Sequence, residues 1–149
     1  MYYENPWIYG DEEFHSRSIN DYYGFVYLIT NSTTERKYVG KKWFYSSKTR
    51  QVKLKKKKYK ASSNWQSYYG SSKELLVDVA TLGKVIFKRE ILHLCYTKGE
   101  TSYYEAKEQF VRGVLLDDGY YNEWIQCKIR KSHLKRKESV VMSAGLDLI

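Results

Sequence analysis

The 149-residue chain has only two cysteines, Cys95 and Cys127, which lie far apart in the sequence. They supply neither a zinc-binding pattern nor a disulfide framework, so we expect both to be buried thiols in a reducing compartment. Pro6 is the single proline, and no apolar run reaches the roughly 20 residues that a membrane-spanning helix needs. The N-terminus is acidic and aromatic, unlike a signal peptide, so we expect a cytoplasmic location.

Acidic residues are missing from positions 36–73, although this segment holds 13 of the 26 Lys and Arg residues. The other positions carry 13 basic and 17 acidic residues, so the net charge of +9 comes entirely from this segment. A solvated lysine-rich loop would have the same composition, but a concentrated basic block is also typical of proteins with a polyanion partner. Aromatic residues within and beside the block favour nucleic acid as that partner: Trp43, Phe44, Tyr45, Tyr59, Trp65, Tyr68 and Tyr69.

The composition is that of a globular chain, with 42% hydrophobic residues, and the length suits one domain. Hydrophobic periodicity and capping residues predict strands at 24–30, 36–41 and 85–95, and helices at 71–83 and 102–116. This order predicts an α+β fold in which a small three-stranded antiparallel sheet is flanked by helices. We expect the second helix to bury a stripe formed by Phe110, Val111, Val114 and Leu115.

Three regions follow from these elements. Residues 1–23 are expected to form an N-terminal arm, and residues 24–130 the folded domain, with a basic insertion at 41–62. Within the insertion, the first half allows a helix, whereas Val52–Lys55 alternates like an exposed strand. Residues 131–149 are expected to form a basic tail that is partly disordered or docks loosely.

Two tyrosine motifs give the chain a specific resemblance. Phe25–Tyr27 forms the first motif, in one predicted strand, and Tyr38–Gly40 forms the second, in the next predicted strand. Tyr27 and Tyr38 are 11 positions apart. This pair resembles the hairpin of the GIY-YIG nuclease family, except that the first glycine, Gly24, stands one residue ahead of its usual place. The resemblance continues over about residues 24–124, with later family positions matched by Gly70 to Leu75, Gly83, Phe87, Ile91-Leu92, Glu105 and Asn122.

The resemblance implies a nuclease that uses a single divalent cation, Mg²⁺ or another such as Mn²⁺. Tyr27 would be the general base, and Tyr38 would orient the water or the phosphate. Glu105 would bind the metal, because Mg²⁺ often takes only one or two protein carboxylates, and Glu108 on the same helix is the alternative ligand. Arg50 would hold the scissile phosphate with its guanidinium fork; Lys42 or Lys48 could replace it.

Other residues are candidates for contacts with the DNA backbone. Lysines beside the second motif and in the insertion would bind phosphate without reading sequence. Two serines at the predicted start of the first helix could cap it or donate to a phosphate there. The candidates are Lys41, Lys42, Lys48, Lys55, Lys57, Ser71 and Ser72. We expect Asn122 to be structural.

The sequence therefore predicts a metal-dependent DNA endonuclease. The stretch Trp65–Ser72 resembles phage and mobile-element members of the family, which favours a homing-type endonuclease of a bacteriophage, acting in the host cytoplasm. A restriction-type endonuclease is an alternative within the same class. From other classes, a non-catalytic nucleic-acid-binding protein on the same scaffold, or a basic structural or ribosome-associated protein, would retain the basic block. The sequence leaves open whether the chain is a monomer or a homodimer.

Overall fold

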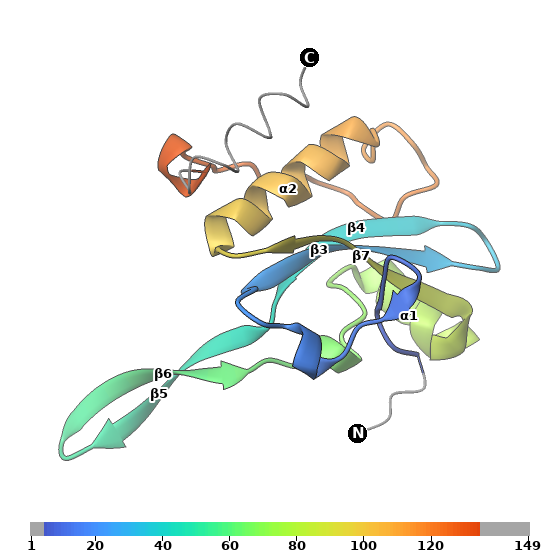
Figure 1. Cartoon of the computed structure of the whole chain (residues 1–149). Coiled ribbons are helices and arrows are strands. Elements are labelled where there is room, and N and C mark those ends of the chain that lie inside the picture. The colour runs from blue at the N-terminus through green and yellow to red at the C-terminus, as the bar shows by residue number, and fades with distance from the viewer. Residues whose placement is uncertain (1–4, 135–149) are drawn as a thin grey trace.

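The computed structural model describes residues 5–134, which form an α+β fold (Figure 1). Four short 3-10 turns, at residues 16–18, 65–67, 84–86 and 131–134, connect or follow the regular elements. The strands and helices, in chain order, are β1 (Ile8–Tyr9), β2 (Glu12–Glu13), β3 (Gly24–Asn31), β4 (Lys37–Trp43), β5 (Tyr45–Val52), β6 (Lys55–Ser62), α1 (Lys73–Leu82), β7 (Phe87–Cys95) and α2 (Lys98–Val111).

The main sheet has five strands in the order β2-β1-β7-β3-β4. Its centre is the predicted antiparallel set of β7, β3 and β4, but the prediction of only three strands was wrong. The N-terminal residues add β1, which runs parallel to β7, and β2, which pairs with β1. Each added strand has two residues, which is too short to produce the alternation of apolar and polar residues from which strands are predicted.

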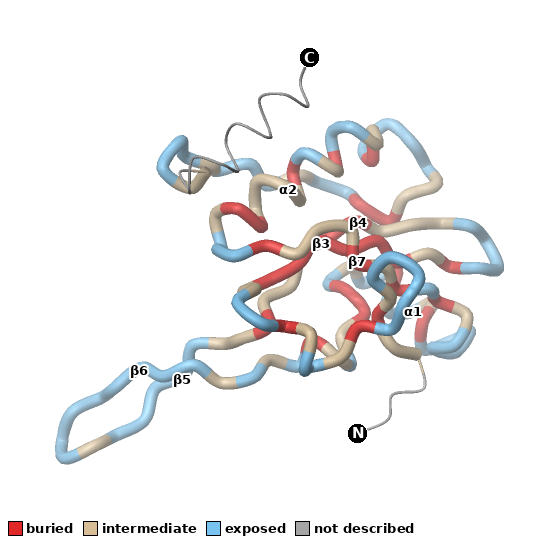
Figure 2. The backbone as a smooth tube through the Cα atoms, viewed as in Figure 1, coloured by how far each residue is buried: buried red, intermediate tan, exposed pale blue. Residues whose placement is uncertain are grey.

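Strand β3 is buried on both faces because its side chains alternate between two apolar clusters. Phe25, Tyr27 and Ile29 join the larger cluster, on the side of α1, where Trp7 and Trp65 also lie. Val26 and Leu28 face the smaller cluster under α2. Figure 2 shows this buried centre of the molecule, with exposed segments around it. The aromatic richness of the sequence therefore goes largely into one core of tilted and edge-to-face rings.

Helix α1 begins and ends where its capping residues predict. The Ser72 side chain accepts a hydrogen bond from the Leu75 amide at 3.3 Å, and Glu74 lies in the first turn. At the other end Gly83 has φ +96°, a conformation that side-chain-bearing residues rarely adopt. Leu75 and Val79 are the buried side chains of this helix.

Helix α2 differs from its prediction in both position and buried face. It spans Lys98–Val111, capped by the Thr97 side chain, whereas the sequence predicted a helix at 102–116. Phe110 and Val111 were expected to be buried but are 62% and 76% exposed. The side chains that α2 buries are short or polar, and the helix packs against β3, β4 and β7. The residues buried along it are Glu100, Thr101, Ala106 and Gln109, and Val114, which follows it, is buried as predicted.

Strands β5 and β6 form a separate two-stranded hairpin that projects from the body (Figure 1). The helix that the first half of the insertion allowed is not formed. A two-residue loop, Lys53-Leu54, joins the strands, and both residues have positive φ, as a type I′ turn requires. This turn prefers Asn-Gly, and Lys-Leu is not a turn signal. The turn therefore falls inside Val52–Lys55, which alternates like an exposed strand in the sequence.

Beyond α2, the described chain has little regular structure. Residues 120–129 are irregular, although a single bridge joins Tyr120 to Lys37, the first residue of β4. Cys95 is buried as expected, but Cys127 is exposed. Of the predicted tail at 131–149, residues 131–134 form a 3-10 turn, and the remainder lies outside the described residues. None of the helices within residues 5–134 is long and apolar enough to cross a bilayer.

Candidate active site

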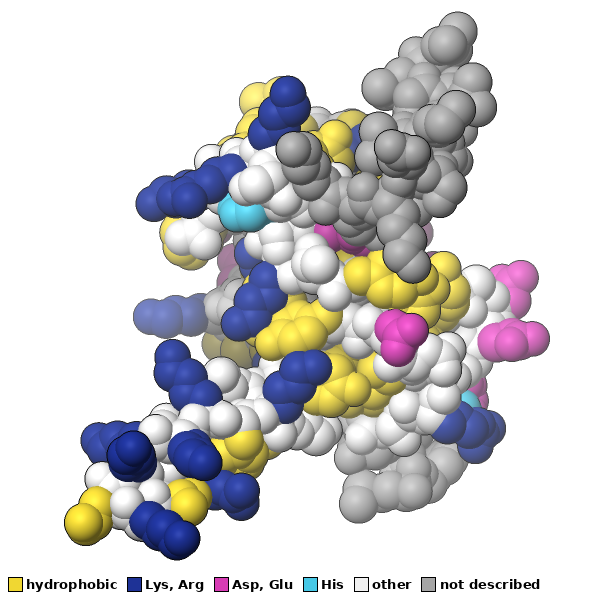
Figure 3. Space-filling model, turned by 60° about the vertical axis from the view of Figure 1, so that its left-hand side comes forward, with side chains coloured by type: hydrophobic (Ala, Val, Ile, Leu, Met, Phe, Trp, Pro, Cys, Tyr) yellow, Lys and Arg dark blue, Asp and Glu magenta, His cyan; other side chains and the backbone are white. Residues whose placement is uncertain are grey.

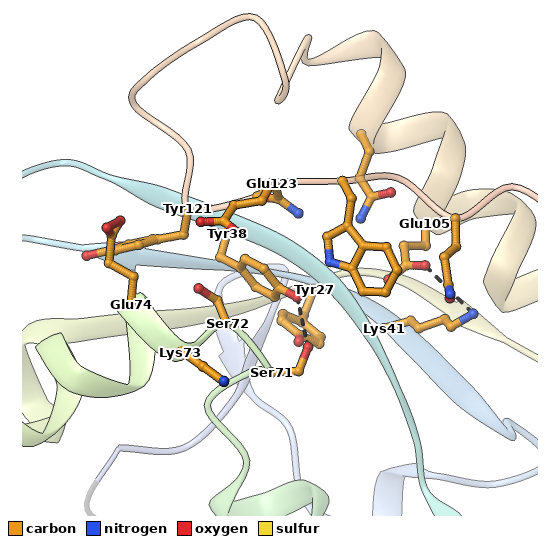
Figure 4. Close-up of a pocket in the computed structure, with 14 residues that line it drawn as sticks. Tyr27, Tyr38, Lys41, Ser71, Ser72, Lys73, Glu74, Glu105, Tyr121 and Glu123 are labelled. Carbon is orange, nitrogen blue, oxygen red and sulfur yellow. Dashed lines mark hydrogen bonds and ion pairs between the residues drawn. The ribbon is translucent and has the colours of Figure 1, made fainter.

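A pocket of about 680 Å³ lies at the β4 edge of the main sheet (Figure 4). One wall is the start of α1, and another is formed by α2 and the irregular segment that follows it. Three of the four predicted catalytic residues line this pocket. The lining residues are Tyr27, Tyr38, Lys41, Ser71, Ser72, Lys73, Glu74, Glu105, Gln109, Tyr121, Asn122, Glu123, Trp124 and Gln126.

Gly40 explains how the two tyrosines reach the same pocket. Tyr27 on β3 pairs directly with Gly40 on β4, and Tyr38 points to the same side of the sheet. The ring centroids of the two tyrosines are 6.2 Å apart. A Cβ atom at Gly40 would lie 2.6 Å from Cζ of Tyr27 and 2.9 Å from Cε2 of Tyr38. Only glycine therefore lets the Tyr27 phenol cross over the edge strand.

The Tyr27 phenol is held in a buried position. The pairing of β3 with β7 shifts in register between Val26 and Tyr27, where Leu92 of β7 is the extra residue. Tyr27 is 1% exposed, and burial, with smaller contributions from Tyr68 and Tyr38, raises the pKa of its phenol well above the usual value. The protein alone thus favours a protonated Tyr27, so the role of general base requires a neighbouring positive charge that lowers this pKa.

Tyr38 is less enclosed and is held by the start of α1. Its hydroxyl lies 3.0 Å from Oγ of Ser71 (Figure 4). Burial raises the pKa of Tyr38, and the hydrogen bond with Ser71 partly offsets the rise. The two predicted serines thus have different roles: Ser72 caps the helix, whereas Ser71 contacts a pocket tyrosine.

Glu105 contributes a carboxylate from the face of α2 that meets β4. Its side chain is 14% exposed, and Oε1 lies 3.7 Å from Nζ of Lys41. Lys41 also donates a hydrogen bond of 2.8 Å to Ser102. Burial raises the pKa of Glu105, and Lys41 lowers it only in part. An acid whose charge is incompletely balanced in this way is suited to binding a cation.

Glu108, the alternative metal ligand, lies outside the pocket lining. Its two carboxylate oxygens are already engaged, one with His93 at 2.8 Å and the other with Arg112 at 2.8 Å. Burial would raise the pKa of Glu108, but these hydrogen bonds outweigh it and leave the pKa lowered. The geometry therefore favours Glu105 over Glu108 as a metal ligand.

Arg50 is not brought together with the other three predicted catalytic residues. It lies on β5 of the hairpin, exposed, with its guanidinium 5.5 Å from the centroid of the Tyr59 ring. Lys48, one of its predicted substitutes, is also on β5. Lys42, the other, lies 4.1 Å over the Tyr68 ring, and burial lowers its pKa. The cations that line the pocket itself are Lys41 and Lys73.

Two amide side chains hold the edge strand in place, and sequence reasoning identified only one of them. The Asn122 side chain accepts from the Val39 amide at 3.0 Å and donates to the Val39 carbonyl at 2.8 Å. Gln109 donates to the same carbonyl at 3.1 Å. These bonds replace a missing neighbouring strand, so the expectation that Asn122 is structural agrees with its contacts.

Arg89 organises the backbone beside the pocket, and the sequence analysis did not identify it. It is buried on β7 and donates to the carbonyls of Asn5, Gln66 and Tyr68, with distances of 2.9 and 2.8 Å to the last two. Its guanidinium lies between the rings of Trp7 and Tyr69. Burial lowers its pKa to about 10. Arg89 thereby fixes the loop that leads to the start of α1.

The pocket fits a hydrated divalent cation better than a metal held only by protein. Residues 5–134 contain no group of three or more His, Cys, Asp or Glu side chains placed to hold a metal. Glu105 supplies one carboxylate, and Gln109, one turn further along α2, has a buried Oε1 without a hydrogen-bond partner among the described residues. Mg²⁺ keeps several waters and often binds one or two carboxylates together with phosphate oxygens, so this donor set is compatible with it.

Among the lining residues, Tyr27, Tyr38 and Glu105, with the two lysines, are groups of the kind that phosphodiester hydrolysis uses. The comparison with protein families agrees: the family described as "Putative endonuclease segE, GIY-YIG domain" matches residues 7–125. The chain belongs to the GIY-YIG endonuclease family, as the two tyrosine motifs predicted. The match also includes the residues that form β1 and β2. No curated protein and no solved structure matched the chain.

Proposed function

We propose that this protein is a divalent-cation-dependent endonuclease that hydrolyses phosphodiester bonds in DNA. The observation that supports this most directly is the convergence of Tyr27, Tyr38 and Glu105 on one pocket across Gly40. Membership of the GIY-YIG family and the basic hairpin support the same reaction and substrate. A homing-type enzyme of a bacteriophage or another mobile element is the setting that we propose.

Hydrolysis joins a water oxygen to phosphorus, breaks one P–O bond, and moves a proton from the water to the leaving oxygen. A cation bound at Glu105 would polarise a phosphoryl oxygen and lower the pKa of adjacent phenols and water. Tyr27 would accept the proton of the attacking water as a phenolate, so its phenol proton, which burial holds by raising the pKa, must first be released. Tyr38, fixed by Ser71, orients the phosphate, and Lys41 and Lys73 offset its charge.

This assignment differs from the expected one in the phosphate-binding cation. Arg50 is on the hairpin, so a contact between its guanidinium and the phosphate in the pocket would require the hairpin to move. Lys41 already lies 3.7 Å from Glu105, on the strand that carries Tyr38. We therefore assign the phosphate-binding role to Lys41, with Lys73 at the opposite wall.

Cleavage of supercoiled plasmid with and without Mg²⁺ tests the proposal. We expect wild-type protein to cut only with the cation. Glu105→Gln removes the ligand charge and should lose cleavage by at least about 100-fold, the scale expected when a transition-state stabilising group is removed. Tyr27→Phe should lose about 100-fold or more, as for a missing general base. Both variants should still bind DNA.

Two controls match these substitutions on the same molecule. Glu108→Gln is the control for Glu105→Gln, because Glu108 lies on the same helix but outside the pocket lining. Tyr103→Phe is the control for Tyr27→Phe, because it removes a tyrosine hydroxyl outside the pocket lining. Both should retain cleavage. Full activity of Glu105→Gln would rule out the metal assignment, and full activity of Tyr27→Phe would rule out the base. DNA binding without any cleavage by wild-type protein would instead indicate the non-catalytic alternative.

A further inference from the structure

The hairpin formed by β5 and β6, residues 45–62, is the most strongly charged part of the described chain; we call it the arm. It contains eight Lys and Arg residues and no Asp or Glu, against a net charge of +9 for the whole protein. All eight are exposed, and Figure 3 shows them covering the projecting hairpin. They are Lys48, Arg50, Lys53, Lys55, Lys56, Lys57, Lys58 and Lys60.

The pocket, in contrast, has too little positive charge to hold a polyanion. Its lining contains two lysines, Lys41 and Lys73, and three glutamates, Glu74, Glu105 and Glu123. Duplex DNA carries about one negative charge per 1.7 Å of helix axis. Without a bound cation, a lining with a formal charge of −1 would repel such a partner, so the affinity for DNA in the absence of divalent cations must come from elsewhere on the molecule.

The arm is held together despite its own charge. Its strands pair only with each other, outside the five-stranded sheet, and an isolated two-stranded hairpin is marginally stable in water. Arg50 lies directly opposite Lys57, and like charges in that position are destabilising. A row of phosphates beside the arm would screen this repulsion. The repulsion between the arm's cations does not stabilise the body of the protein.

The dimensions of the arm suit one form of nucleic acid. Two strands of eight residues extend about 25 Å. The major groove of B-form DNA is about 12 Å wide and admits a two-stranded β-ribbon, whereas the corresponding groove of A-form RNA is deep and narrow. Strand β4 ends one residue before β5 begins, so a duplex lying along the arm continues toward Lys41 and the pocket.

We propose that the arm is a DNA-binding β-ribbon that lies in the major groove of a B-form duplex and supplies most of the affinity for the substrate. This rests on the proposed function insofar as that duplex is the one that is cleaved. Both strands of the arm carry cations, so it can contact the phosphates on both walls of the groove.

The tip of the arm provides a second observation. Leu54 is 93% exposed at φ +66°, where glycine would be less strained. A large apolar side chain there adds nothing to the fold. In the arm's bound position, Leu54 leads the ribbon and makes an apolar contact with the duplex, as a thymine methyl group in the major groove allows.

Binding is measured by fluorescence anisotropy with the full-length chain and a 30-base-pair DNA duplex, without divalent cations, across a range of salt concentrations. One variant changes Lys55, Lys56, Lys57 and Lys58 to Gln. A control variant with the same net charge changes four exposed lysines elsewhere to Gln: Lys84, Lys88, Lys107 and Lys128. At 0.1 M salt we expect the arm variant to lose at least about tenfold in affinity, with its salt slope reduced by about 3 to 4, and the control to change by less than about threefold.

Equal losses in the arm variant and the control would show that only net charge matters, and no loss in the arm variant would overturn the proposal. Wild-type protein should also bind an RNA duplex of the same sequence at least about tenfold more weakly than the DNA, and should protect guanine N7 from dimethyl sulfate. Equal affinity for RNA, or unprotected N7 atoms, would exclude the major groove. These results do not depend on cleavage, so failure of the proposed reaction would be seen separately in the plasmid assay.

Leu54→Gly separates contact from folding at the tip. Glycine favours the turn, so a purely structural role predicts unchanged or tighter binding. We expect a loss of about threefold or more from removal of an apolar contact, with an unchanged melting temperature. Unchanged or tighter binding by Leu54→Gly would remove the tip contact from the proposal.

Discussion

Gly40 controls the pocket at the scale of a single residue. The Tyr27 phenol occupies the space where a Cβ would be, and the Tyr38 ring borders the same space. Neither neighbour is free to move: Tyr27 is enclosed by the core, and Tyr38 is bonded to Ser71. A methyl group at Gly40 would therefore displace the two groups that define the proposed chemistry. This is the physical reason that the second tyrosine motif, Tyr38–Gly40, ends in glycine.

We predict that Gly40→Ala folds with a loss of about 1–3 kcal/mol in the free energy of unfolding, the usual cost of overpacking, and loses most of its cleavage activity. Gly113→Ala is the control. Gly113 has φ +60° and open space around it, so alanine strains the backbone there without reaching the pocket. Urea unfolding and plasmid cleavage of both variants distinguish the cases. Equal loss of activity in the two would mean that stability alone is responsible.

The same tyrosines show how much of the site could be predicted. The structure brings Tyr27, Tyr38 and Glu105 to one pocket. The two tyrosines could be placed together because a hairpin motif fixes its own register over a few residues, whereas Glu105, on α2, followed only from the family resemblance. The position of Arg50 depended on an unusual insertion, and the tight turn that folds it has Lys-Leu in place of the usual Asn-Gly. Its separation from the pocket could not be predicted from spacing.

At the scale of elements, local chemistry succeeded where the determinant was local. The boundaries of α1 follow from Ser72 and Gly83, which act on their own helix. The prediction of the buried face of α2 was wrong. It relied on the apolar Phe110 and Val111, whereas the helix contacts the sheet through smaller residues such as Ala106. Which face a helix buries depends on what packs against it, and periodicity does not contain that information.

Arg89 is the clearest case of an element held by a distant residue. From β7 it binds carbonyls in the segment at 66–68 and at Asn5. We predict that Arg89→Met lowers the free energy of unfolding by at least about 3 kcal/mol, because buried carbonyls are left without donors. Lys88→Met, the exposed neighbour, should change it by about 0.5 kcal/mol or less. Thermal unfolding followed by circular dichroism measures both. A melting temperature for Arg89→Met equal to that of Lys88→Met would contradict the clamp.

The whole molecule combines a dense body with an arm that has no core of its own. Two apolar clusters enclose β3 from both faces, whereas the strands of the arm are exposed along nearly all of their length (Figure 2). The proposed catalytic groups lie in the body, and most of the excess positive charge lies in the arm. In the proposed function, this separation would let the pocket keep an unbalanced carboxylate for a cation while the arm attracts DNA.

We predict that the two parts differ in local stability. In the free protein, amides of β3 should exchange with deuterium only through global unfolding, because their hydrogen bonds lie at the centre of the sheet. Amides that pair β5 with β6 should exchange at least about 100-fold faster, since opening the arm exposes little apolar surface. Hydrogen–deuterium exchange followed by mass spectrometry resolves the two segments.

Helix α1, which is anchored to the core by Leu75 and Val79, is the internal reference and should exchange at rates between those of β3 and the arm. Arm amides protected as strongly as those of β3 would show that the hairpin packs against another surface in solution, and the arm would then not be free to enter a groove.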